Sequence, residues 1–324
     1  MMGLLEGGAN MQTTLSRRRT RLGAYLRANW LYYALSVPGL VYVIGYKLLP
    51  LVGLQLAFKD FSIFAGDNIL ESMFVSPWVG MQHFEKIFGS ADFWRLLRNT
   101  LTISLMKLVV LFPIPILVAL MLNEVRCRPF QRVTQTLIYM PHFISWVVIH
   151  GIFLTMLSAN GILNRVLEAL DLGKTSFYTD PTAFRWLLVF TEGWKESGWG
   201  AIVYLAALTG IDQELYEAAY VDGAGRLRRI WHVTLPGIAP VISLMLLLRL
   251  GGILEAGYGQ ILIMYNPTVY STADVLQTYI YRTGLGKLDF SSATALGLFE
   301  SLVGFVLIVS CNGVSRKAFG RSLW

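Results

Sequence analysis

The stretch that decides the fold is LTISLMKLVVLFPIPILVALML, residues 101–122, in which Lys107 is the single charged side chain. A helix needs about 20 consecutive, mostly apolar residues to cross the hydrocarbon core of a bilayer. This stretch has that length, and a proline pair near its middle is tolerated more readily in membrane helices than in soluble ones. The stretch therefore predicts a transmembrane helix.

The composition indicates that the rest of the chain is of the same kind. The 324 residues are 55% hydrophobic and 15% charged, whereas an ordinary soluble domain is about 25% charged. Nine tryptophans suit a chain that anchors indole rings at two water–lipid interfaces. We predict an all-α integral membrane protein with six transmembrane helices, at residues 30–58, 101–122, 137–157, 186–208, 236–258 and 292–313.

The fourth span carries a qualification, and the segments between spans are predicted to be short. TEGWKESGWG, residues 191–200, is expected to interrupt the fourth span. The segments at about 59–96, 158–185 and 259–291 are expected to be loops with at most one helical turn each.

The distribution of basic residues predicts the orientation. Lys and Arg are enriched in cytoplasmic loops of membrane proteins. With both termini in the cytoplasm, the inner segments hold the clusters at 17–21, 126–132, 226–229 and 316–321, while the outer segments hold more acids than cations. The net charge of +7 is thus explained by topology, and no nucleic-acid partner is expected.

Several kinds of chemistry are excluded by what the sequence lacks. The two cysteines, Cys127 and Cys311, are too far apart to indicate a disulfide framework, and the four histidines have no metal-ligand spacing. No G-x-x-x-x-G-K-[ST] phosphate loop occurs; GLGK at 284–287 is the nearest fragment. We expect no metal site, no catalytic residue and no cofactor bound by this chain.

Ionisable residues inside predicted spans are costly, and so they are candidates for function. Glu192, Trp194, Lys195, Glu196 and Trp199 crowd one part of the fourth span, where aromatic faces and polar groups could line a hydrated path for sugars. An internal salt bridge at a helix break is an equal alternative. The candidate path residues are Trp194, Lys195, Arg249, Glu255, Tyr258 and Gln260.

Two alternative functions remain open from the residues alone. The intramembrane acids could serve an ion-coupled secondary transporter. His142 and Ser145, three residues apart on the third predicted span, could serve an intramembrane hydrolase, although a lone Ser and His without an orienting acid are far more often structural.

A polar segment between the fourth and fifth spans has the shape of a docking element. Asp212 is a suitable N-cap, Glu214 follows in the first turn, and Gly223 or Gly225 can end the helix. The short cytoplasmic helix between them has a face of small residues and one projecting acid, Glu217. Such a helix suits a groove on another protein, and a solvated loop is the alternative.

This segment, EAAYVDGAGRLRRIWHVTLP at 217–236, resembles the EAA signature of ABC importer permeases. The resemblance implies a type I importer permease architecture, in which the segment is a coupling helix that docks into the ATP-hydrolysing subunit. The residues that match the motif are Glu217, Ala218, Ala219, Asp222, Gly223, Ala224, Leu235 and Pro236.

Three further segments resemble the carbohydrate-uptake branch of these permeases, and the alginate-oligosaccharide importers among them. They are GWKESGWGAIVYLAALTGIDQELYEAA at 193–219, LIMYNPTVYSTADVLQTYIYRTGL at 262–285, and GRSLW at 320–324. The resemblance implies import of oligosaccharides. If the sugar is acidic, Lys195 and Arg249 would supply its countercharge.

The resemblance also implies partners and a location. The partners are a second permease subunit, two ATPase subunits that bind ATP and Mg²⁺, and an extracytoplasmic solute-binding protein, all at the bacterial cytoplasmic (inner) membrane. The chain itself is then a transport subunit and not an enzyme. We expect a basic amphipathic segment at 1–29, a permease domain at 30–314 with its coupling loop at 209–236, and a cytoplasmic tail at 315–324.

Overall fold

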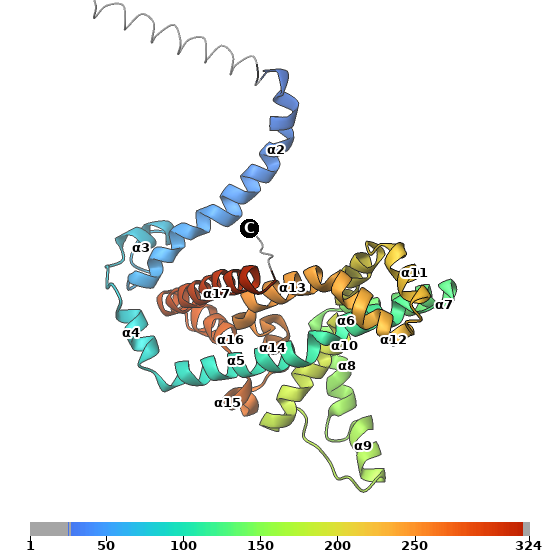
Figure 1. The fold of residues 1–324 in the computed structure, drawn as a ribbon. Coiled ribbons are helices and arrows are strands. Elements are labelled where there is room, and N and C mark those ends of the chain that lie inside the picture. Colours follow the sequence, from blue (N-terminus) through green and yellow to red (C-terminus); the bar gives the residue numbers. More distant parts are fainter. Residues whose placement is uncertain (1–24, 26, 320–324) are drawn as a thin grey trace, which may run out of the picture. The chain divides into compact units, whose positions relative to one another are not determined.

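The structure, a computed structural model, describes Tyr25 and residues 27–319, and within them the regular elements are helices apart from one isolated bridge between Lys59 and Trp78 (Figure 1). The all-α prediction is confirmed. Five described segments are long and apolar enough to cross a membrane. They are Trp30–Phe58, Ala91–Asn123, Trp146–Ala169, Arg226–Gly251 and Phe290–Gly313. Most of the predicted segment 1–29 and the GRSLW end lie outside the described residues.

The residues up to Gln55 and those from Leu56 onward form two compact units. The first unit holds most of the first predicted span, which begins as α2 (Trp30–Tyr42) and continues through a π-helical turn, η1 (Val43–Leu48), into the 3₁₀ segment η2 (Leu49–Phe58). No side chain of α2 is buried. A helix that is apolar all round needs lipid or another chain around it.

In the second unit, the second span starts earlier than predicted. It consists of α5 (Ala91–Leu111) and α6 (Pro113–Asn123). The Ser90 hydroxyl accepts a hydrogen bond from Phe93 N, and Asp92 lies in the first turn, so the helix has a proper N-cap well before the apolar run begins. Hydropathy alone missed this polar first part.

The third span differs from the prediction of one helix over 137–157. The amphipathic helix α7 (Arg128–Tyr139) is followed by a 3₁₀ turn, η3 (Met140–Phe143), and the apolar segment then begins with α8 (Trp146–Leu157) and ends with α9 (Ile162–Ala169). Ser145 caps α8 by accepting from Val148 N at 3.4 Å. The hydrolase alternative required His142 and Ser145 to lie on one helix. They do not, because His142 belongs to η3 and Ser145 caps α8.

The fourth span is one unbroken helix, α10 (Pro181–Thr209), capped by Asp180. The prediction that TEGWKESGWG interrupts it is wrong, because the polar side chains of this stretch find partners on neighbouring helices. In Figure 1, α10 lies against α6, and it also contacts α5, α7 and α13. Gly198 allows the approach of α7: an added Cβ would collide with the Ile138 carbonyl oxygen.

The polar segment after α10 folds as α11 (Gln213–Val221), α12 (Arg226–Arg229) and the π turn η4 (Ile230–Thr234), which leads directly into α13 (Leu235–Gly251). The predicted fifth span, 236–258, is too long. The backbone leaves the helix after Gly251, passes through η5 (Ile253–Glu255), and takes positive φ values at Ala256 (52°) and Gly257 (77°) before α14 (Tyr258–Met264) begins.

The segments predicted to be loops contain more helix than expected. They include α3 (Ile69–Val75), α4 (Gln82–Phe88), η6 (Pro267–Val269), α15 (Tyr270–Ala273), α16 (Leu276–Tyr281) and η7 (Arg282–Gly286). A buried ion pair fixes the last of these: Arg282 Nη2 lies 2.6 Å from Asp274 Oδ2. The hydrogen bonds that Arg282 donates to Asp274 raise the pKa of the guanidinium.

The final span is α17 (Phe290–Phe319), which runs alongside α13 and α16 (Figure 1). It starts close to the predicted residue 292 and continues beyond 313. The largest apolar cluster joins α8, α10 and α14 and includes Ile149, Phe184, Leu188 and Ile261. The polar network described below lies on α5, α10, α13 and α14.

Candidate functional site

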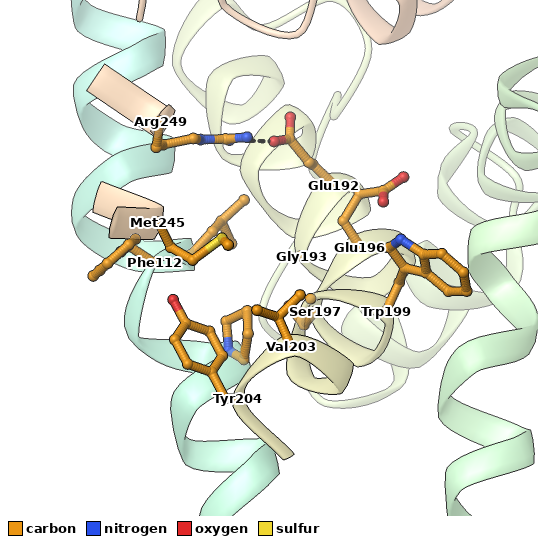
Figure 2. Close-up of a pocket in the computed structure, with 13 residues that line it drawn as sticks. Phe112, Glu192, Gly193, Glu196, Ser197, Trp199, Val203, Tyr204, Met245 and Arg249 are labelled. Carbon is orange, nitrogen blue, oxygen red and sulfur yellow. Dashed lines mark hydrogen bonds and ion pairs between the residues drawn. The ribbon is translucent and has the colours of Figure 1, made fainter. Parts of the chain in front are cut away.

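A cavity of about 340 Å³ opens between α5, α6, α10 and α13 (Figure 2). Its walls combine apolar side chains with a few polar ones, as ligand-binding cavities usually do. The lining residues are Leu111, Phe112, Pro115, Glu192, Gly193, Glu196, Ser197, Trp199, Gly200, Val203, Tyr204, Met245 and Arg249.

Three charged residues from three helices meet beside this cavity. The Arg249 guanidinium on α13 extends toward the Glu192 carboxylate on α10, with Nη2 2.6 Å from Oε1 (Figure 2). The other oxygen of Glu192, Oε2, lies 2.6 Å from Lys107 Nζ on α5. The side chains of Lys107 and Glu192 are 1% and 9% exposed, whereas that of Arg249 is 50% exposed. Arg249 and Glu192 both line the cavity, and Arg249 is by far the more exposed of the two.

Lys107 is the anchor of this network. Its ammonium group donates to the Ala256 carbonyl oxygen at 2.9 Å and to Gln260 Oε1 at 2.7 Å, in addition to its ion pair with Glu192. The ammonium group thus has three oxygen partners, two through hydrogen bonds and one through the ion pair. One side chain on α5 therefore ties together α10, α14 and the break that follows α13.

A second polar cluster supports the end of α7. Lys195 on α10 donates to three carbonyl oxygens of the turn between α7 and α8, those of Pro141, His142 and Ile144. Carbonyl groups at a helix C-terminus have no partner inside the helix, and a cation satisfies them well. His142 Nδ1 lies 2.7 Å from Glu196 Oε2, and the His142 ring stacks on Trp199 with centroids 4.3 Å apart.

The polar segment before α13 presents an exposed helix beside a groove. Asp212 caps α11 by accepting from Glu214 N at 3.0 Å, and Gly223 ends the turn with a φ of 73°. Glu217 is exposed. A cavity of about 350 Å³ runs along the small-residue face, and its lining residues are Leu215, Ala218, Ala219, Asp222, Ala224, Arg228, Arg229, His232 and Val233.

The α11 segment is fixed to the start of α13. The Tyr216 hydroxyl and the Thr234 hydroxyl lie 3.0 Å apart, and Thr234 directly precedes the first residue of α13. Pro236 lies in the first turn of α13, where a missing N–H costs nothing. One side-chain hydrogen bond and a short stretch of chain thus join α11 to the start of α13.

Comparison with known proteins identifies the family. The family described as "binding-protein-dependent transport system inner membrane component" matches residues 112–319. The chain belongs to this family. Among curated relatives, it is 43% identical to protein LplB of Bacillus subtilis, with 91% of each chain covered. It is 39% identical to the polygalacturonan/rhamnogalacturonan transport system permease protein YteP of the same species, over 94% of this chain and 93% of YteP.

Solved structures agree with this assignment. The permease is 41% identical to a chain of a bacterial ABC transporter involved in the import of the acidic polysaccharide alginate, with a TM-score of 0.84 over 92% of this chain and 99% of that one. A second match is the bacterial alginate ABC transporter in complex with an alginate pentasaccharide-bound periplasmic protein (40% identity, TM-score 0.85, 94% and 100% covered). The predicted type I permease fold is confirmed, and the permease is a membrane transport subunit rather than an enzyme. The secondary-transporter and hydrolase alternatives are not retained.

The structure separates the six candidate path residues of the permease. Arg249 lines the main cavity, and it also lines a smaller cavity of about 110 Å³ together with Glu255. Lys195 and Gln260 are buried. The Lys195 ammonium donates to backbone carbonyls, and the Gln260 amide donates to Leu188 O and Thr191 Oγ1.

The two aromatic candidates lie elsewhere. Trp194 packs edge-to-face on Phe153, with ring centroids 5.6 Å apart, and Tyr258 packs against Tyr281 at 6.4 Å. Neither is among the residues that line the main cavity. Their role in the path stays a prediction.

Four residues of the site are not among the six candidate path residues: Lys107, Glu192, Trp199 and Tyr204. The sequence contained a signal for Lys107 and Glu192, because both are charged residues inside predicted spans. It contained no signal for their pairing, which joins residues far apart in the chain. Trp199 had been noted in the polar cluster of the fourth span, whereas Tyr204 became recognisable only when the cavity showed which face of α10 is open.

Proposed function

We propose that this permease forms, with a second permease, the path by which oligosaccharides rich in uronic acids enter a bacterial cell across its cytoplasmic (inner) membrane. The names of its relatives support the cargo, because polygalacturonan and alginate are both acidic polysaccharides. An extracytoplasmic solute-binding protein would deliver the oligosaccharide, as a periplasmic protein is present with the related alginate transporter.

The continuous connection from α11 through α13 to the cavity carries this proposal. α11 presents the exposed Glu217 and is pinned by Tyr216 to the residue before α13. The other end of α13 holds Arg249 at the cavity. A docking helix at one end of a span and a cavity-lining residue at the other allow a movement of the docking helix to reach the ligand-facing part of the span.

The cavity suits a sugar because it combines flat rings with polar groups. Trp199 and Tyr204 are aromatic side chains at its wall, while Ser197 and Arg249 supply donors (Figure 2). We place Arg249 in the path in this conformation. Lys195 and Gln260 act by holding the surrounding backbone, whereas Glu255, Trp194 and Tyr258 stay as predicted path residues.

The coupling role rests on the EAA-like segment. Glu217, Ala218, Ala219, Asp222, Gly223 and Ala224 would enter a cleft of the ATPase, and Leu235 and Pro236 would begin the span that moves. ATP and Mg²⁺ would be bound by two partner ATPase subunits, so this chain needs no cofactor of its own. Closure of the ATPase pair would then shift α11 and reorient the spans by alternating access.

Charge reversal at Glu217 tests the coupling. In the reconstituted transporter, Glu217→Lys is expected to lower both oligosaccharide uptake and cargo-stimulated ATP hydrolysis by about tenfold or more. The substitution removes a charge-assisted contact between Glu217 and a basic residue of the ATPase, and the new lysine repels that residue. Uptake into proteoliposomes and phosphate release are measured with the cargo-loaded binding protein present.

A matched control is Glu124→Lys, which makes the same charge change at another exposed acid predicted to be cytoplasmic. It is expected to transport at the wild-type rate. Wild-type uptake by the Glu217→Lys transporter would show that the coupling assignment is wrong. A wild-type transporter that imports neutral and acidic oligosaccharides at no measurable rate would contradict the import function itself.

A further inference from the structure

We infer that Arg249 is the carboxylate-binding residue of the path, and that Glu192 and Lys107 are the positioning residues that hold its guanidinium at the cavity. This inference rests on the proposed function, since it names the group in the cargo that the site recognises: the carboxylate of a uronic acid unit.

The Arg249 side chain has unused capacity to donate hydrogen bonds. It is half exposed, and within the described residues its hydrogen bond goes from Nη2 to Glu192 Oε1 at 2.6 Å. A guanidinium carries five N–H donors arranged in a planar fork that matches a carboxylate. The edge that faces the cavity can therefore take a second carboxylate while the bond to Glu192 persists.

The local charge balance favours an incoming anion. Two cations, Lys107 and Arg249, share the single carboxylate of Glu192. Unbalanced charge is costly where the surroundings are poorly hydrated, and the cost falls when a partner of opposite sign arrives. The cluster as it stands has one positive charge in excess, and a uronate carboxylate would balance it.

The two neighbouring acids do not already fill this role. Glu196 also lines the cavity, but its carboxylate lies 2.7 Å from His142 Nδ1 and 3.6 Å from Lys195 Nζ. Glu255 lines the smaller cavity with Arg249, yet among the described residues the one carboxylate within ion-pair distance of Arg249 is that of Glu192. Arg249 thus faces the main cavity with its charge only partly compensated.

Lys107 orients Arg249 indirectly, through Glu192. The three acceptors around its ammonium group hold Lys107 in place, and Lys107 in turn holds Oε2 of Glu192, which leaves Oε1 to orient the guanidinium. A flexible arginine would lose conformational entropy on binding a ligand, whereas this one is already oriented. The arrangement favours a ligand carboxylate at one fixed depth in the cavity.

Direct binding to the assembled transporter, without the solute-binding protein, tests the inference. The probes are a short galacturonate oligosaccharide and the same oligosaccharide with its carboxyl groups reduced to alcohols. The wild-type transporter is expected to bind the acid about tenfold more tightly than the reduced sugar, with a preference that shrinks as salt is raised. Arg249→Gln is expected to remove the preference, and Arg249→Lys to retain part of it.

Arg95→Gln is the matched control, because Arg95 is also a partly exposed arginine in an ion pair on α5, with Asp92 at 2.8 Å, but does not line the cavity. It should keep the wild-type preference. An Arg249→Gln transporter that still prefers the acid, or a wild-type transporter whose binding of the acid is insensitive to salt, would overturn the inference while leaving import intact. Binding of neither probe, with no uptake of either, would overturn the proposed function as well.

Discussion

Replacing Lys107 by methionine is expected to lower the free energy of unfolding of the permease by about 3–5 kcal/mol, the range seen when one partner of a buried ion pair is removed. Methionine keeps roughly the length of the side chain but leaves Ala256 O and Gln260 Oε1 without their donor and Glu192 Oε2 without its ion-pair partner. Thermal unfolding of the detergent-solubilised transporter, followed by gel filtration, should show a melting temperature about 5–10 °C lower.

Two comparisons make this prediction specific. Lys86→Met changes an exposed lysine on α4 and is expected to shift the melting temperature little. Lys107→Met combined with Glu192→Gln should cost less than the sum of the two single changes, because the pair acts as a unit. Additive costs, or a Lys107→Met protein as stable as the wild type, would show that the network does not hold α5, α10 and α14 together.

A single methyl group at Gly198 is expected to cost about 3 kcal/mol, at the upper end of what overpacking usually costs. The Cβ of alanine would collide with the carbonyl oxygen of Ile138 and lie 2.6 Å from its carbonyl carbon. These are backbone atoms, so they cannot rotate away, and α7 would have to move off α10. Gly198→Ala should therefore lower the melting temperature and the yield of assembled transporter.

The same substitution at Gly151 should have the opposite effect. Gly151 lies inside α8, and an added Cβ there meets no atom within 4 Å. Alanine stabilises a helix interior by about 0.5–1 kcal/mol relative to glycine, so Gly151→Ala is expected to raise the melting temperature slightly. Equal effects of the two substitutions would contradict the close approach of α7 and α10.

The sequence determined the membrane class and most of the spans. Apolar length is a one-dimensional property, and the bilayer acts on each span separately, so the runs at 101–122 and 292–313 indicated α5–α6 and α17 without knowledge of their neighbours. The caps of α11 were also local: Asp212 bonds to Glu214 N, two residues away. The EAA-like sequence at 217–236 indicated the family for the same reason, since its signal is local to the segment.

What the sequence missed depends on contacts between distant residues. The stretch 191–200 was expected to break the fourth span because its charges were considered alone, yet Lys195 and Glu196 are satisfied by the turn after α7. The fifth span was predicted to extend too far because its apolar residues were also considered without their tertiary contacts. Its apolar sequence continues past Gly251, while the backbone turns away and is held by Lys107 through Ala256 O.

The candidate site shows the same division. From the sequence, Lys195, Arg249 and Gln260 were equivalent candidates for the path, because each is a polar residue in apolar surroundings. Only the tertiary structure decided that Lys195 and Gln260 are buried with backbone and side-chain partners while Arg249 reaches a cavity. The physical reason is that a buried polar group must find a partner, and which partner it finds depends on how helices from distant parts of the chain pack. Lys107, Glu192 and Arg249 meet because α5, α10 and α13 pack together, and no spacing along the chain encodes that meeting.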